Sequence, residues 1–355
     1  MDRNAECDVC VVGLGGSGLS AIDELLAAGL DVVGIDAGVV AGGAAGRNGG
    51  FLLAGLAAFH HRAAAELGQD RAADLYRLTM AEIERISARH PKAVRQTGSL
   101  RIADSEDELA DCREQSRAML AADLPVEDYS GPEGEGLLFP RDRVFDPFVR
   151  CAELAADVAA RGARLYEHTP ATAVSGSEVK SGRVSVRCGA VIVAVDGRLE
   201  RILPEAGSHV RTARLQMLAT APTTEVRLPR PVYRRYGYEY YQQTVDGRIA
   251  LGGFRDRAGD EEWTHEATPT LEVQDRLESY LREVIGVKAP VTHRWAASVG
   301  YSRTLLPLCA EVRSRVWAVG GYSGTGNVVG ALLGRAAAQV VIRGSSAIHD
   351  AFYAG

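Results

Sequence analysis

The chain has 355 residues, 46% hydrophobic and 24% charged, which is the composition of a globular protein large enough for two domains. Its net charge of −6 argues against a nucleic-acid partner, and it holds no uninterrupted run of about 18 apolar residues that would predict a membrane span. The six cysteines have no repeated spacing and the first residues lack the pattern of a signal peptide, so we expect a cytoplasmic protein.

The chain begins with a pattern typical of dinucleotide binding. An apolar run over residues 7–12 ends in Gly-x-Gly-x-x-Gly at residues 13–18, and an alanine- and leucine-rich helical pattern follows. A second apolar run, residues 32–35, ends at Asp36. This order predicts a strand, a tight turn, a helix and a second strand that together bind a dinucleotide. The alternative is a glycine-rich turn in an unrelated α/β protein, and the pattern alone does not distinguish NAD from FAD.

Several residues of this pattern have a physical role in binding a pyrophosphate. Gly13 allows the tight turn, Gly15 lets the phosphates approach the backbone, and Gly18 lets the helix pack on the strand. The helix that begins near Gly16 directs unpaired N–H groups at the phosphates. The Asp36 carboxylate can accept hydrogen bonds from ribose hydroxyls and disfavours a 2′-phosphate, so NADP is not expected.

Periodicity predicts the remaining elements in outline. Ser105 and Glu108 form a capping pattern at the start of one helix, and Asp246 with Gly247 marks a hairpin turn. The predicted helices are 51–90, 105–121, 147–161 and 270–285, and the predicted strands are 95–103, 162–171, 190–194, 316–321 and the two arms of a hairpin over 238–253.

Three further motifs follow one another along the chain. They read Gly-Arg-Asn-Gly-Gly at residues 46–50, Tyr-Tyr-Gln-Gln-Thr-Val-Asp-Gly-Arg-Ile-Ala-Leu-Gly-Gly at residues 240–253, and Gly-Gly-Tyr-Ser-Gly-Thr-Gly-Asn at residues 320–327. Together they resemble the FAD-dependent D-amino acid oxidase family, and within it the branch of gamma-glutamylputrescine oxidoreductase and glycine or sarcosine oxidase-like flavoenzymes. The resemblance extends from about residue 7 to about residue 344 and implies that the dinucleotide is FAD.

The resemblance also implies the fold class, which is α/β with an α+β second domain. A Rossmann-like FAD-binding domain would be interleaved with a mixed-sheet substrate domain. We expect residues 1–90, 142–210 and 305–355 to form the FAD-binding domain. Residues 91–141 and 211–304 would then form the substrate-binding domain.

In the resembling family, main-chain groups at the ends of strands and helices hold most of the FAD. N–H groups at the start of the last helix, near Gly324, would face the N1 and C2 carbonyl edge of the flavin and stabilise its reduced form. Val-Asp-Gly at residues 195–197 departs from the family's usual Thr-Gly or Thr-Asn. We expect no metal site and see no signature of covalent flavin attachment, with Cys309 as a candidate by position. The expected FAD-binding residues are Gly13, Gly15, Gly16, Ser17, Gly18, Asp36, Ala37, Arg47, Asn48, Gly49, Gly50, Ala171, Ala194, Gly324, Thr325, Gly326, Asn327 and Val328.

Substrate binding is expected on the predicted hairpin. Tyr238, Tyr240 and Tyr241 bring phenol hydroxyls to one strand, and alternation sends Tyr240 and Tyr241 to opposite faces. One of them could orient the substrate by a hydrogen bond or a cation–π contact, or all three could serve only in sheet packing. The candidate catalytic residues are Tyr240, Tyr241, Arg303 and Thr325.

The chain departs from the family at positions that usually contact the substrate. Val299 stands where amino acid oxidases of the family place an arginine that pairs with the substrate carboxylate. Thr304 stands where they place an aspartate, and Thr325 where histidine is frequent. Arg303 or Arg255 could replace the missing arginine, although each could also be a surface cation. Ordinary anchoring of a free amino acid is therefore not expected.

The resemblance predicts an FAD-dependent oxidoreductase that oxidises a CH–NH bond of an amine or amino-acid derivative. Hydride would pass to flavin N5, water would hydrolyse the imine, and oxygen would be the electron acceptor. The expected partners are thus a small-molecule amine and oxygen or another acceptor. One alternative is a flavin-binding protein without amine turnover that has an accessory or assembly role. Another is an NAD(P)H-dependent flavin monooxygenase.

Overall fold

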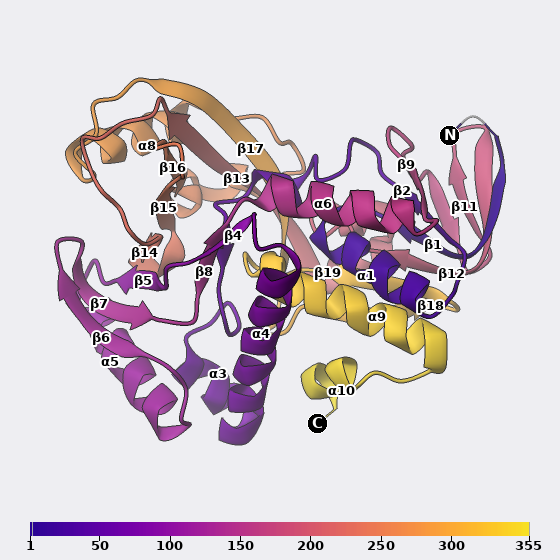
Figure 1. Cartoon of the computed structure of the whole chain (residues 1–355), viewed down its shortest axis with the longest axis horizontal. Coiled ribbons are helices and arrows are strands. Elements are labelled where there is room, and N and C mark those ends of the chain that lie inside the picture. The colour runs from indigo at the N-terminus through magenta and orange to yellow at the C-terminus, as the bar shows by residue number, and fades with distance from the viewer. Residues whose placement is uncertain (2, 355) are drawn as a thin grey trace. The chain divides into compact units, whose positions relative to one another are not determined.

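The computed structural model describes residues 1 and 3–354 of the chain. Contacts divide the chain into two compact units, each made of more than one segment (Figure 1). The first unit consists of Met1–Arg47, Pro147–Ala213 and Val299–Gly355, and the second of Asn48–Asp146 and Arg214–Ser298. The chain leaves and re-enters each unit, as interleaved domains require.

The first boundary lies at residue 47, whereas the sequence predicted it at residue 90. Residues 48–90 belong to the second unit because their helices share its core: Phe59 and Tyr76 pack with Met119. The later boundaries lie at residues 147, 213 and 299, where the sequence predicted 142, 211 and 305.

The first unit is built on a sheet whose central strands are parallel. The strands β9, β2, β1, β12 and β19 lie in this order, and β10, β11 and β18 add antiparallel pairs. Apolar side chains fill the central strands because they are buried on both faces. The bounds are β1 Ala5–Val12, β2 Val32–Ile35, β9 Arg164–Tyr166, β10 Ala173–Ser175, β11 Glu178–Ser181, β12 Val184–Val193, β18 Leu308–Arg313 and β19 Val316–Gly320.

The helices of the first unit follow the strands in the alternation that an α/β fold requires. Figure 1 shows α6, α1 and α9 lying side by side, and α1 contacts both of the others. Pro147 begins α6, as predicted for a residue without a backbone N–H. The bounds are α1 Gly16–Ala27, α2 Ala44–Arg47, α6 Pro147–Ala160, α7 Leu199–Ile202, η1 Pro204–Ser208, η4 Gly326–Gly330, α9 Ala331–Arg343 and α10 Ala347–Tyr353.

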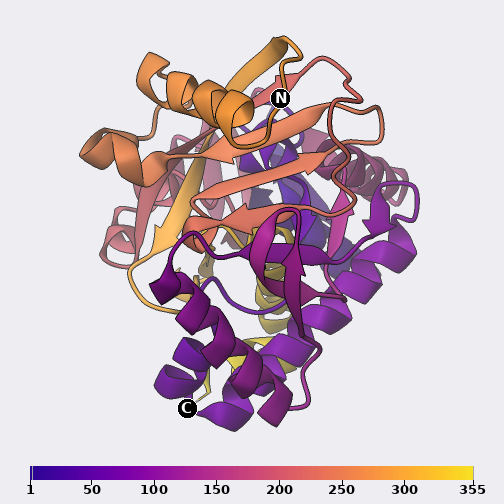
Figure 2. The same ribbon diagram turned by 90° about the vertical axis from the view of Figure 1, so that its left-hand side faces the viewer.

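The second unit contains a mixed sheet in the order β17-β13-β16-β15-β14-β5-β7-β6 and a small sheet in the order β3-β8-β4. Figure 2 shows strands of the large sheet side by side, with α8 in orange beside them. The strands are β3 Phe51–Leu52, β4 Val94–Gln96, β5 Ser99–Ile102, β6 Glu127–Gly131, β7 Gly134–Phe139, β8 Arg143–Phe145, β13 Val210–Thr220, β14 Val232–Arg234, β15 Glu239–Gln243, β16 Ile249–Gly253 and β17 Val291–Ser302. The helices are α3 His60–Leu67, α4 Gln69–Arg89, α5 Glu106–Ala121, α8 Leu271–Glu283, η2 Arg235–Gly237 and η3 Arg255–Glu262.

Local signals predicted most of these elements, and glycines account for two errors. The Ser105 hydroxyl accepts a hydrogen bond from Glu108 N at 3.2 Å, so the predicted helix cap is confirmed. The helix predicted over 51–90 is wrong as one element: Phe51–Leu52 is strand β3, the first helix begins at His60, and Gly68, with a φ of +89°, separates α3 from α4. The strand predicted over 95–103 is divided at Gly98, with a φ of +69°, into β4 and β5 of different sheets.

Candidate functional site

The carboxyl ends of three neighbouring parallel strands meet at one edge of the first unit's sheet. Val12 at the end of β1 pairs with Ile35 at the end of β2 and with Val193 at the end of β12. Gly13 and Asp36 follow directly, as does Ala194 after β12. Ligands of open α/β sheets bind outside this edge, so predicted FAD-binding residues from three separate segments gather where the fold favours a ligand.

The turn after β1 has no room for side chains at two of its glycines. Gly13 has a φ of +105°, and a Cβ there would lie 2.6 Å from the Ala194 carbonyl oxygen. A Cβ on Gly18 would lie 1.9 Å from the Gly13 carbonyl oxygen. Because both contacts are with backbone, the turn and α1 can take this arrangement only with glycine at these positions.

The first turn of α1 suits an anion. Its N-cap is Gly15, which offers no capping side chain, and no acidic residue lies in the first turn. The Arg150 guanidinium, buried on α6, lies beside this turn, since a Cβ on Gly16 would be 3.1 Å from its Nη1 atom. N–H groups, the helix dipole and a nearby cation thus add to positive potential at one place. The residues present fit the pyrophosphate of a dinucleotide.

The Asp36 carboxylate lies at the edge of this turn and is partly exposed. Its two oxygens accept hydrogen bonds from Leu14 N and Gly38 N, each at 2.8 Å. A carboxylate has about four acceptor sites, so capacity for ribose hydroxyls remains. Thr169 N donates to the Asp36 carbonyl oxygen at 2.6 Å, which brings the segment before Ala171 beside this acid. These residues fit the adenosine end of FAD.

The turn before the last helix is fastened to α1 through Tyr322. Its buried hydroxyl donates to Ser17 Oγ at 2.7 Å, while the Thr325 hydroxyl donates to the Tyr322 carbonyl oxygen at 2.7 Å. The hydroxyls of Ser17 and Thr325 each take part in a hydrogen bond within the protein, the first as acceptor and the second as donor. The helix that begins at Gly326 has no side-chain cap and no acidic residue in its first turn. This end suits the partial negative charge of a reduced flavin.

The second glycine cluster spans the boundary between the units. Arg47 ends α2 in the first unit, and Asn48 begins the second unit. Asn48 Oδ1 accepts from Gly50 N at 2.8 Å and holds the turn. Gln242 on β15 donates through Nε2 to the Gly49 carbonyl oxygen, so this turn is fastened to the strand that carries the predicted substrate tyrosines.

Tyr240 lies on an aromatic face of the second unit together with Phe51 and Tyr233. Its ring centroid is 6.3 Å from that of Phe51 and 5.9 Å from that of Tyr233. The ring also lies against Gly49 and Gly252, where a Cβ would meet it at 3.1 and 2.5 Å. Tyr240 is partly exposed and held by neighbours on several sides, so the orientation of its ring is fixed.

Tyr241 points to the opposite side of β15 and is 4% exposed. It packs in the core formed with α8, and its ring centroid is 6.2 Å from that of Tyr280. Burial raises the pKa of its hydroxyl above the ordinary value. The alternation predicted from sequence is therefore present, and it assigns Tyr241 to packing within the unit.

The candidate arginines have other contacts. Arg303 is exposed, its N–H donates to the His209 carbonyl oxygen, and its Nε donates to the Gly207 carbonyl oxygen at 3.3 Å, so its side chain turns toward η1. This direction gives no support to a role in gripping the substrate. Arg255 lies over the Trp263 ring, 4.9 Å from its centroid, and 5.8 Å from the Tyr238 ring centroid.

Cys309 is 2% exposed, and burial raises the pKa of its thiol to about 12. A buried, protonated thiol is a poor nucleophile, which argues against a covalent bond to flavin at this position.

Sequence reasoning missed four residues that shape the site. Tyr322 and Gln242 connect turns that lie far apart in the sequence, and Arg150 approaches α1 from another helix; no local pattern reports such contacts. Asp196 could have been singled out from the sequence, because an aspartate at this position departs from the family's usual residues. Its carboxylate accepts from three backbone N–H groups, which could not be read from the sequence.

Comparison with known proteins agrees with this arrangement. The family described as "FAD dependent oxidoreductase" matches residues 8–340. The chain therefore belongs to the DAO family of FAD-dependent oxidoreductases. The predicted family, α/β fold class, cofactor and oxidoreductase function are confirmed.

Particular relatives lie at low identity but over nearly the whole chain. Gamma-glutamylputrescine oxidoreductase of Escherichia coli strain K12 is 26% identical, covering 99% of this chain and 87% of its own length. A probable oxidoreductase OrdL of Rhizobium meliloti strain 1021 is 25% identical, covering 96% and 84%. Among solved structures, L-proline dehydrogenase from P. horikoshii has a TM-score of 0.81 at 18% identity, and glycine oxidase from Geobacillus kaustophilus 0.80 at 19%, each covering 97% of this chain and 96% of the other.

Within the described residues, each helix taken singly is too short or too polar to cross a membrane. The bent pair Gly326–Arg343 and Ala347–Tyr353, with 117° between its parts, reaches the required length and composition only when both are counted.

Proposed function

We propose that this FAD-dependent oxidoreductase oxidises the CH–NH bond of a small amine or amino-acid derivative, with oxygen as the electron acceptor. The observation that carries the proposal is the near full-length likeness to gamma-glutamylputrescine oxidoreductase, a protein whose name specifies an amine substrate. Solved structures of glycine oxidase and iminodiacetate oxidase share the fold and support the same class of substrate.

FAD, when bound, supplies the hydride acceptor, and the protein supplies binding, orientation and charge. In this proposal residues 13–18 and Asp36 hold the adenosine diphosphate part of the cofactor. Arg47 and residues 324–328, all in the first unit, hold the flavin part. The two uncapped helix ends, at Gly16 and Gly326, provide N–H donors for the pyrophosphate and for the reduced flavin.

The aromatic face would position the substrate. Tyr240 combines a partly exposed ring, which can contact an ammonium group, with a hydroxyl that can bond an amine nitrogen. At the position where the family's amino acid oxidases carry arginine, Val299 is 9% exposed and provides no charge for a carboxylate. We therefore infer a substrate whose reacting carbon is not held through an adjacent carboxylate.

A cytoplasmic location completes the proposal. All six cysteines are unbonded, which suits a reducing compartment.

An absorbance spectrum of the purified protein, followed by anaerobic titration with primary, secondary and amino-acid amines, tests the function. We expect flavin bands that at least one amine bleaches and that air restores. Protein without flavin would contradict cofactor binding. A fully loaded flavin that no amine reduces would favour the accessory role, and bleaching by NADPH would favour a monooxygenase.

A further inference from the structure

Asp196 lies just beyond β12 in a left-handed conformation, with a φ of +52°. Its Oδ1 atom accepts from Gly321 N at 2.9 Å and from Tyr322 N at 3.2 Å, and its Oδ2 atom accepts from Gly300 N at 3.0 Å. One side chain therefore joins the end of a central parallel strand to two other segments of the first unit.

The backbone is shaped to admit this carboxylate. A Cβ on Gly300 would lie 2.7 Å from Asp196 Oδ1, and a Cβ on Gly320 would lie 3.0 Å from Asp196 Cα. Burial raises the pKa of the carboxyl to about 6 in spite of the N–H donors. Removing a carboxylate from water is costly, and here the backbone N–H groups that donate to it offset part of that cost.

The contacts continue from Asp196 to the dinucleotide fingerprint. Gly321 and Tyr322 belong to the turn before the last helix, and the Tyr322 hydroxyl donates to Ser17 Oγ in the first turn of α1. The Tyr322 ring lies against Gly326 and Gly330, where Cβ atoms would meet it at 2.9 and 3.1 Å. The turn is thus fixed at one end by a carboxylate and at the other by a buried phenol.

We propose that Asp196 is a positioning residue: by holding the 321–322 turn against β12, it sets where the N–H groups at the start of the last helix lie relative to the flavin. The inference rests on the proposed function, because it takes these N–H groups to face the flavin. N–H donors stabilise reduced flavin most when they are already held in place before reduction, because no reorganisation is then needed. Asp196 would therefore act on the flavin through the backbone.

The test compares the flavin-loaded wild type with Asp196→Ala, Asp196→Asn and Tyr322→Phe. The measurements are the flavin midpoint potential and the rate of FAD release on dilution, followed by flavin fluorescence. Asp196→Ala removes all three acceptor contacts, so we expect a more negative potential and FAD release faster by about tenfold, the effect of one or two lost hydrogen bonds. Asp196→Asn keeps one carbonyl oxygen as acceptor and should restore most of both properties.

Glu82→Ala is the matched control, because Glu82 is a buried carboxylate that pairs with Arg85 on α4 in the second unit. It should lower thermal stability and leave the potential unchanged. If Asp196→Ala does not fold, Asp196→Asn decides, since it has one acceptor oxygen in place of two and should show both changes at a smaller size. Tyr322→Phe, which loses the contact of the same turn with Ser17, should also speed FAD release. Unchanged potential and release in the variant that folds, or an equal shift in Glu82→Ala, would overturn the proposal. A wild type without flavin would instead refute the proposed function, and would do so before any variant is compared.

Discussion

At the scale of single residues, the fingerprint turn depends on the absence of a Cβ at Gly13 and at Gly18. In Gly18→Ala the new methyl group would meet the Gly13 carbonyl oxygen at 1.9 Å, so α1 must shift away from β1. We expect FAD affinity to fall by about tenfold or more, because the shift moves the N–H groups at the start of α1 and weakens their hydrogen bonds to the pyrophosphate. Titration of the apoprotein with FAD measures it.

Gly29→Ala controls for the loss of a glycine near the same helix. Gly29 follows α1 with a φ of +80°, but a Cβ there meets nothing within 4 Å. The variant should lose about 1 kcal/mol of stability from backbone strain and keep its FAD affinity. Equal affinities for FAD in Gly18→Ala and wild type would show that the glycine fingerprint does not bind FAD.

Two neighbouring tyrosines allow a sharp comparison on one strand. Tyr240 is partly exposed on the aromatic face, whereas Tyr241 is buried beside Tyr280. With the amine that bleaches the flavin fastest, Tyr240→Phe should reduce kcat/KM by about tenfold, as expected for one lost hydrogen bond to substrate. Tyr241→Phe should change thermal stability more than turnover. A larger loss of turnover in Tyr241→Phe than in Tyr240→Phe would contradict the assignment of Tyr240 to the substrate and of Tyr241 to packing.

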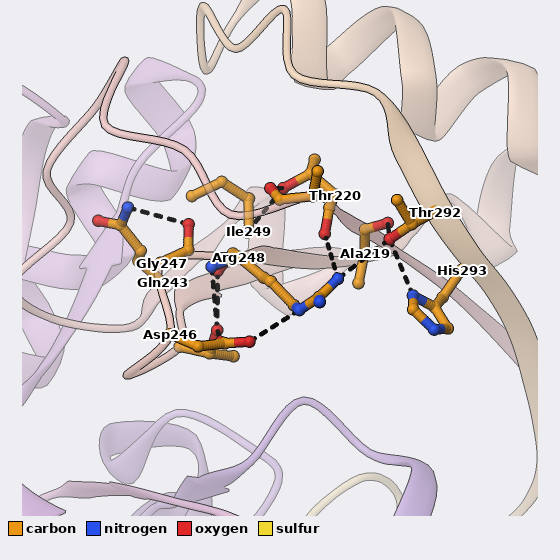
Figure 3. Close-up of polar contacts among 11 residues, drawn as sticks. Ala219, Thr220, Gln243, Asp246, Gly247, Arg248, Ile249, Thr292 and His293 are labelled. Carbon is orange, nitrogen blue, oxygen red and sulfur yellow. Dashed lines mark hydrogen bonds and ion pairs between the residues drawn. The ribbon is translucent and has the colours of Figure 1, made fainter.

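At the scale of elements, the hairpin that carries Tyr240 is fixed by its turn (Figure 3). Arg248 bonds Asp246 at 2.8 Å, and its Nη1 atom donates to the Thr220 carbonyl oxygen at 3.1 Å and to Thr292 Oγ1 at 3.2 Å. It thereby joins β16 to β13 and β17, which are not its neighbours in the sequence. Ile249 N also donates to Thr220 Oγ1 at 3.0 Å.

Arg248→Ala is expected to lower the free energy of unfolding by about 1–2 kcal/mol, because several hydrogen bonds between strands are lost. Arg257→Ala is the matched control: its side chain is 57% exposed and lies 3.7 Å from Asp256, so it should change stability by less than about 0.5 kcal/mol. Thermal denaturation followed by circular dichroism compares them. Equal losses in both variants would show that the turn contacts do not stabilise the hairpin.

The elements that the sequence predicted are those with strong local signals. The strand before Gly13, the cap at Ser105 and the hairpin turn at Asp246 each depend on residues a few positions apart. The single helix predicted over 51–90 is wrong because its first residues form β3, which pairs with the distant strand β8, and because Gly68 interrupts the helical periodicity of the rest. Asp196 and Tyr322 were missed as partners because a contact between distant segments leaves no periodicity in the sequence.

At the scale of the whole molecule, a buried acid in the second unit should give stability a dependence on pH. Asp142 accepts from Ala54 N at 2.9 Å and from Ser99 Oγ at 2.6 Å, and burial raises its pKa from 3.8 to about 7. The folded state thus binds the proton more tightly than the unfolded chain. This contribution to stability is fully present below about pH 4 and is lost as the pH rises through 7.

Asp142→Asn removes the titration and keeps an acceptor for Ala54 N. The melting temperature of the wild type, measured relative to that of Asp142→Asn, should therefore fall as the pH rises from 4 to 7. Above that range the difference should be constant. A difference that does not change with pH would mean that Asp142 titrates alike in the folded and unfolded states.

Removal of FAD should destabilise the molecule unevenly. Free FAD at one hundred times its Kd adds about 2.7 kcal/mol to the folded state, so the apoprotein should melt at a lower temperature. The loss should be largest in the first unit, at the starts of α1 and of the helix from Gly326, whose uncapped N–H groups lose their proposed ligand. Hydrogen exchange of holoprotein and apoprotein measures this, with α8 of the second unit as the internal reference. Faster exchange in α8 than at these two helix starts would place the main effect of FAD elsewhere in the fold.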